Sequence, residues 1–169
     1  MNRTIWTNKK AFKSAARENP DCEYCGQVET MDHLIHDCEN YSTPLWMELG
    51  ESLTQTMRAT TGRDMAEIRF TPLEIIYKKI HPTIQVHIKK KSLQQTLLHL
   101  LQEVKRGIIF RRMNPNAHLE RVNQHRIRAH LLSTVSKIIS FLQYQETRNH
   151  RDSIDLLVHL QRTISVRVQ

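Results

Sequence analysis

All three cysteines of this 169-residue chain fall within one short segment, and a histidine lies between them. Cys22, Cys25, His33 and Cys38 form the pattern C-x2-C-x7-H-x4-C. Thiolates and imidazoles are the ligands that tetrahedral Zn²⁺ prefers, and structural zinc sites are closed by four such groups. The C-x2-C pair places two sulfurs on one side of an ion, and the seven residues that follow allow the chain to turn back. The pattern predicts one structural zinc ion.

Other uses of these cysteines fit less well, although a chance grouping stays open. A disulfide framework would leave one of the three cysteines unpaired. A redox C-x-x-C pair would need a βαβ context, which the sequence does not show. Residues 1–10 are polar and basic and contain no apolar signal segment. We therefore expect an intracellular protein and not a secreted one. Between a nuclear and a cytoplasmic location, only the family resemblance given below implies the nuclear one.

The elements that must position these ligands can be read from the local sequence. Residues 31–36 are predicted to form one short helix, with Thr30 as its N-cap. His33 and Cys38 are five residues apart, which is about 140° around a continuous α-helix. The helix should therefore end near residue 37, so that Cys38 can turn back to the ion. His36 is the alternative fourth ligand, and otherwise a solvated histidine.

The segment Cys22-Glu-Tyr-Cys25-Gly-Gln-Val-Glu-Thr-Met-Asp-His33-Leu-Ile-His-Asp-Cys38, with a tryptophan eight residues later, carries a family pattern. It resembles the zinc-binding segment at the C-terminal end of reverse transcriptases from non-LTR (LINE-type) retrotransposons. That family's pattern is C-x-x-C, a Glu-Thr pair, His-Leu, Cys and often Trp. The matching residues, within about positions 15–50, are Cys22, Cys25, Glu29, Thr30, His33, Leu34, Cys38 and Trp46. The resemblance implies that Cys22, Cys25, His33 and Cys38 are the ligands and that His36 is a bystander.

The resemblance carries over no catalytic residues. A complete element would contain a polymerase domain with paired catalytic aspartates, but 21 residues precede Cys22 and the chain has no Asp-Asp dipeptide. We therefore expect a non-catalytic terminal piece of such a protein, with no small-molecule substrate. A zinc hydrolase using Glu29 as general base fits poorly, because four protein ligands leave no open position on the metal.

Hydrophobic periodicity predicts a mainly α fold, a small zinc knuckle followed by a basic α-helical bundle. We expect a basic flexible tail over residues 1–20, the knuckle and its following helix over 21–60, and a helical basic domain over 61–169. Helices are predicted at 44–60, from Pro72 to 80 after a short extended piece, and at 93–113, 119–142 and 154–164. No run approaches 18 consecutive apolar residues, so no membrane span is expected.

The formal net charge of +8 is distributed very unevenly along the chain. It is +4 over residues 1–20, −8 over 21–74, +10 over 75–128 and +2 over 129–169. The acidic knuckle would repel phosphate, so RNA or DNA should contact the basic helices that follow. The predicted phosphate contacts are Lys78, Lys79, Lys89, Lys90, Lys91, Lys105, Arg106, Arg111, Arg112, Arg121, Arg126 and Arg128.

Two other interpretations of this charge pattern stay open. The basic face could be merely solvated, balancing the acidic half. The acidic knuckle could also dock onto the basic helices or onto a partner chain, which would make the protein a zinc-stabilised interaction module with no nucleic-acid affinity. Aromatic residues for base stacking are few in this region, only Tyr77 and Phe110.

Overall fold

The computed structural model describes residues 7–113, 123–145 and 150–167. In these ranges the chain is mainly α-helical, as predicted, and forms no β-strand beyond an isolated bridge between Asp21 and Val28. The elements are α1 Asn8–Lys13, a π-helix η1 His33–Asp37, α2 Ser42–Thr61, α3 Pro72–Ile75, α4 Pro82–Gln85, α5 Lys91–Met113, α6 Gln124–Tyr144 and α7 Arg151–Val166.

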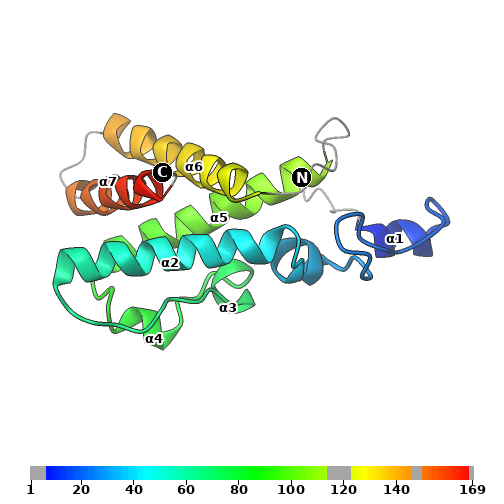
Figure 1. Ribbon diagram of the computed structural model, residues 1–169, viewed down its shortest axis with the longest axis horizontal. Coiled ribbons are helices and arrows are strands. Elements are labelled where there is room, and N and C mark those ends of the chain that lie inside the picture. The colour runs from blue at the N-terminus through cyan, green and yellow to red at the C-terminus, as the bar shows by residue number, and fades with distance from the viewer. Residues whose placement is uncertain (1–6, 114–122, 146–149, 168–169) are drawn as a thin grey trace.

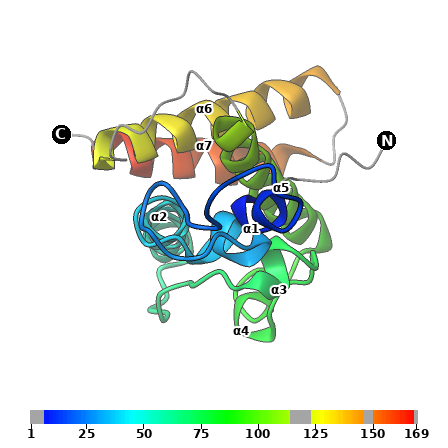
Figure 2. The same cartoon turned by 90° about the vertical axis from the view of Figure 1, so that its right-hand side faces the viewer.

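Four long helices, α2, α5, α6 and α7, form the body of the molecule. Helices α6 and α7 lie side by side and cover one face of α2 and α5 (Figures 1 and 2). The apolar stripes predicted from the sequence face the interior of this bundle. Side chains at most 1% exposed include Leu49, Leu53, Leu101, Val104, Ile108, Leu131, Val135, Leu157 and Leu160. Burial of such stripes is the main stabilising contribution to a helical bundle.

The connection between α2 and α5 covers the opposite face of these two helices and carries α3 and α4 (Figures 1 and 2). Gly62 ends α2 in the left-handed conformation with φ +64°. The following extended piece passes so close to α2 that a Cβ on Gly50 would lie 2.2 Å from the Ile68 carbonyl oxygen. Position 50 therefore accepts no side chain without a shift of backbone.

The helix after Pro72 is present but shorter than predicted. A capping box starts it: the Thr71 side chain accepts from a backbone N–H, and Glu74 accepts from the Thr71 N–H at 2.8 Å. It ends at Ile75 instead of 80, because the chain turns back at Lys78, which has φ +55°. The predicted helix 119–142 begins at Gln124 in the described residues, and positions 119–122 lie outside them.

Residues 7–20 are not the loose tail that we expected from their charge. Helix α1 is capped by the Thr7 side chain, and Asn8 is buried. The Asn8 backbone N–H donates to Glu29 Oε1 at 2.8 Å, and its Nδ2 donates to the Asp21 carbonyl at 2.6 Å. A buried acceptor on the knuckle thus orders this segment, which composition alone does not indicate. Residues 1–6 of the predicted tail lie outside the described residues.

None of the helices in the described ranges is both long enough and apolar enough to cross a bilayer.

Candidate metal centre

The C-x2-C segment forms a tight hydrogen-bonded turn. The Cys22 N–H donates to the Gln27 carbonyl at 2.6 Å, and the Gly26 N–H donates to the Cys22 carbonyl at 2.8 Å. Gly26 has φ +76°, a conformation that costs glycine little. The Tyr24 N–H points at the Cys22 sulfur, 3.4 Å away. Such N–H···S contacts stabilise a thiolate, so the turn suits Cys22 to metal ligation.

The second pair of ligands is positioned by a π-helix and not by an α-helix. The Cys38 N–H donates to the His33 carbonyl at 2.9 Å, a hydrogen bond that spans five residues. His33 and Cys38 therefore lie one wide turn apart, and both reach the same side of the helix. The predicted cap is present: Thr30 Oγ1 accepts from the His33 N–H at 3.1 Å. The helix ends at Asp37, as expected.

All four predicted ligands come together at one point. One ligand atom from each of Cys22, Cys25, His33 and Cys38 can be chosen so that all four lie within 4.8 Å of one another. The Cys22 and Cys38 sulfurs are 3.9 Å apart, and the Cys25 sulfur is 3.2 Å from His33 Nε2. A tetrahedral zinc site requires about 3.8 Å between two sulfurs and about 3.6 Å between sulfur and nitrogen. The cluster could therefore hold one metal ion.

The two buried sulfurs are joined by one hydrogen bond. The hydrogen bond with the Cys38 thiol lowers the pKa of Cys22 to about 4, and the same contact, followed by burial, raises the pKa of Cys38 above its ordinary value. Two thiolates at this separation repel each other unless a cation lies between them. A divalent ion would displace the proton of the hydrogen bond, and it keeps a coordinating thiol deprotonated.

His36, the alternative ligand, points away from the cluster. Its Nε2 lies 3.0 Å from the Phe70 carbonyl oxygen, and its Nδ1 lies 2.5 Å from the Asp37 carboxylate. It therefore connects the π-helix to the segment before α3. The geometry thus favours His33 over His36 as the ligand.

An apolar layer closes the inner side of the metal centre. Leu34 and Ile35 are both 4% exposed, and Trp46 of α2 is 3% exposed. The Trp46 indole N–H donates to the Ile35 carbonyl at 2.7 Å, and its ring meets Phe70 edge-on at 6.4 Å between centroids. Trp46 therefore joins the π-helix to α2 and reports on whether the metal centre is folded.

Glu29, the glutamate of the Glu-Thr pair, fastens the metal centre to the helical bundle. Its carboxylate is fully buried and receives two hydrogen bonds from Arg112 of α5, at 2.8 and 3.1 Å. Arg112 also donates to Asn8 Oδ1 at 2.6 Å, as does Arg17 at 3.0 Å. Glu29 is thus engaged in a bidentate ion pair that ties together α1, the knuckle and α5. The sequence alone does not reveal this ion pair, because Arg112 lies 83 residues further along the chain than Glu29.

A second buried carboxylate repeats this arrangement on α2. Glu48 is 4% exposed and lies 3.1 Å from Arg128 of α6 and 3.7 Å from Arg167 at the end of α7. Arg167 also pairs with Glu51 at 2.6 Å. The acidic and basic halves of the chain therefore neutralise each other in part within the fold.

The predicted phosphate contacts consequently fall into different environments. Five of them already have a partner within the fold. Lys90 pairs with Asp152, Arg106 with Glu103, Arg112 with Glu29 and Arg128 with Glu48, and Arg111 lies over the ring of Tyr41. Arg126 is also engaged, and Arg121 lies outside the described residues. No side-chain partner is present among the described residues for Lys78, Lys79, Lys89, Lys91 and Lys105.

The unpartnered lysines belong to residues 78–91 and the adjoining face of α5. Helices α3 and α5 are in contact, and Gln102 of α5 donates to the Ile75 carbonyl at 3.0 Å. Burial, followed by the charges of Lys78 and Arg106, lowers the pKa of Lys105. Like charges from two distant segments are thus held near one another, with an exposed Tyr77 beside them.

Comparison with protein-family models, with curated proteins and with solved structures gives no match. The kinship with retrotransposon reverse transcriptases therefore stays a prediction from the motif.

Proposed function

We propose that this protein is a non-catalytic, zinc-binding and nucleic-acid-associating module, of the kind found at the C-terminal end of non-LTR retrotransposon reverse transcriptases. The convergence of the four ligand atoms supports the zinc part of this proposal. Three thiolates and one imidazole select zinc over Mg²⁺ or Ca²⁺, which prefer oxygen ligands.

The zinc ion has a structural role in this proposal. Four protein ligands complete the coordination of Zn²⁺, whereas a catalytic zinc keeps an open position for water. The knuckle has few apolar side chains of its own, mainly Leu34 and Ile35. A structural zinc ion contributes about 10–16 kcal/mol of binding free energy, which is folding free energy when the site does not exist in the unfolded chain.

Metal content tests this assignment, with the two neighbouring histidines as a matched pair. Purified wild-type protein should contain one zinc per chain by elemental analysis. His33→Ala and Cys38→Ser should lose it, whereas His36→Ala should retain it, because His36 contacts the Phe70 carbonyl instead. A metal-free wild type, or zinc retained in Cys38→Ser, would remove the proposed site.

The nucleic-acid part of the proposal is carried by one observation, the group of exposed lysines within residues 78–91 that have no acidic partner in the described chain. Lys78, Lys79, Lys89 and Lys91 are all exposed along one connection. Charges that serve only to balance acids within the fold would be paired, as Arg112 and Arg128 are. Unpaired lysines grouped in one short stretch of chain suit a phosphate backbone, which they bind by releasing condensed counterions.

The salt dependence of binding tests this part. Affinity for duplex DNA should fall with salt with a logarithmic slope near −0.9 for each neutralised phosphate, or about −0.7 for single strands. Lys78→Ala combined with Lys79→Ala should reduce both affinity and slope. Lys13→Ala, an exposed lysine on α1, is the matched control and should change little. A flat salt response would contradict nucleic-acid binding.

The second candidate is a zinc-stabilised protein-interaction module. The docking of Glu29 onto Arg112 and of Glu48 onto Arg128 favours it, because both show acidic and basic segments meeting through buried pairs. This function predicts defined oligomers or partner complexes in light scattering, together with no measurable affinity for RNA or DNA.

A further inference from the structure

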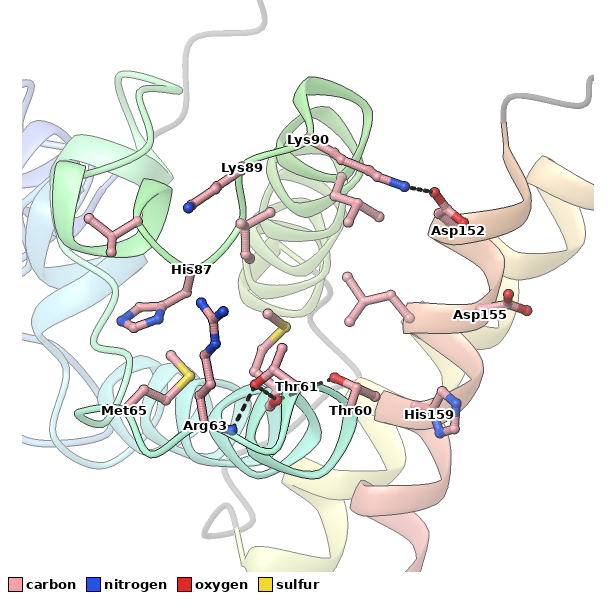
Figure 3. Close-up of a pocket in the computed structure, with 15 residues that line it drawn as sticks. Thr60, Thr61, Arg63, Met65, His87, Lys89, Lys90, Asp152, Asp155 and His159 are labelled. Atoms are coloured by element: carbon pink, nitrogen blue, oxygen red, sulfur yellow. Dashed lines mark hydrogen bonds and ion pairs between the residues drawn. The ribbon is translucent and has the colours of Figure 1, made fainter.

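A pocket of about 580 Å³ is lined by residues from the C-terminal end of α2 (Figure 3), which lies at the end of the helix away from the metal centre (Figure 1). It lies between the end of α2, the connection from α4 to α5, and the first turns of α7. Its volume falls within the roughly 300–1,000 Å³ typical of small-molecule sites. Its lining includes Arg63, His87, Lys89, Asp155, Leu156 and His159.

One side of this pocket is cationic. Arg63, His87 and Lys89 come from two separate segments and lie on the same side of the pocket (Figure 3). Within the described ranges none of the three side chains has a hydrogen-bond or ion-pair partner. Lys90, by contrast, is paired with Asp152 at the rim. An unpaired guanidinium and ammonium beside an imidazole form a cradle for an anionic group such as phosphate.

The floor of the pocket is apolar and its far side is polar. Met57 and Met65 are buried beneath it, and Leu93 and Leu156 line it from α5 and α7. Methionine sulfur packs favourably against aromatic rings. Asp155 and His159 stand on the α7 side, opposite the cationic wall (Figure 3). A ligand that matches all three surfaces has an anionic group, a flat ring and a polar ring edge.

We propose that this pocket binds one nucleotide, with its phosphate at Arg63, His87 and Lys89 and its base on the methionine and leucine floor. A fatty-acid anion would also satisfy the cations and the floor, but it has no polar edge to offer to Asp155 and His159 on the α7 side. The inference rests on the proposed function, since Lys89 belongs both to the pocket and to the group of unpartnered lysines. The nucleotide is either free or part of a strand.

Two probes distinguish these sources. Adenosine monophosphate, titrated by calorimetry, tests a free nucleotide, and an oligodeoxynucleotide containing 2-aminopurine tests a base within a strand by its fluorescence. Arg63→Gln should weaken binding of the relevant probe roughly tenfold or more, the loss of a charge-assisted hydrogen bond. Leu156→Glu, which places a carboxylate on the floor, should abolish the 2-aminopurine response. Lys13→Gln lies outside both the pocket and the group of unpartnered lysines, and it should leave both pocket signals unchanged.

The outcomes separate this inference from the proposed function. Nucleotide binding, or a 2-aminopurine response, that Arg63→Gln and Leu156→Glu remove supports the pocket, even if the salt-dependent strand affinity is absent. Salt-dependent strand binding with neither signal leaves the proposed function in place and overturns the pocket. Absence of strand and nucleotide binding overturns both. Circular dichroism on each variant establishes that the helices are intact.

Discussion

The ion pair between Glu29 and Arg112 offers the sharpest test of how the metal centre is attached to the bundle. Arg112→Met keeps an unbranched apolar stem of similar reach but removes the guanidinium. Glu29 is fully buried, so its carboxylate would keep only the 2.8 Å hydrogen bond from the Asn8 N–H and would lose both contacts to Arg112. The Arg112 side chain is only 18% exposed, so water can replace few of the hydrogen bonds that Glu29 loses.

Removing one partner of a buried pair costs about 3–5 kcal/mol, because the remaining charge is left without compensation. For a chain of this size such a loss corresponds to a fall in Tm of roughly 6–20 °C. Arg106→Met is the matched control on the same helix, since the Arg106 side chain is 74% exposed and its partner Glu103 keeps Lys137 at 3.3 Å. An ion pair with such an exposed arginine is worth about 0–1 kcal/mol, so the control should melt close to the wild type.

The assay is thermal and urea unfolding of zinc-saturated protein, followed by far-UV circular dichroism. Combining Arg112→Met with Glu29→Gln should restore part of the lost stability, because the double variant leaves no unpaired buried charge. Equal melting temperatures for Arg112→Met and Arg106→Met would refute the reasoning. A double variant that loses more stability than the sum of the two single losses would also refute it.

Three other perturbations have defined outcomes. Removing zinc with a chelator should expose Trp46 and shift its fluorescence emission to longer wavelength, while the far-UV helix signal changes little. Trp46→Phe should abolish that shift. An unshifted emission in the wild type would contradict the prediction. Gly50→Ala should cost about 1–3 kcal/mol in urea unfolding, because its Cβ would meet the Ile68 carbonyl, whereas the exposed Gln55→Ala should be nearly neutral. Burial, followed by the charge of Arg111, lowers the pKa of His130, so the unfolded chain binds the proton more readily. The stabilising contribution of neutral His130 is present above its ordinary pKa of 6.5 and is lost as pH falls. His130→Gln should therefore lose less stability than wild type between about pH 7.5 and pH 5.5, and an unchanged pH dependence would count against this assignment.

The local features of this protein follow from its sequence. The C-x2-C-x7-H-x4-C spacing predicted which four side chains meet, because a knuckle and one short helix are built from contacts within 17 residues. The apolar stripes of the long helices predicted which faces are buried, since helical periodicity is itself a local property. The Thr30 cap was predicted for the same reason.

The tertiary structure decided what joins these local units. Arg112 and Arg128, predicted as phosphate contacts, pair with Glu29 and Glu48, and Asn8 becomes a buried part of the same network. The sequence shows that acidic and basic blocks exist, but not which charges meet, because each pairing depends on how segments 80 or more residues apart pack. The π-helical turn at His33 was hidden for a related reason. A π-helical turn is rare, and local sequence does not favour it over an α-helical turn. It is stabilised by its surroundings, here by the buried contact of Trp46 with the Ile35 carbonyl.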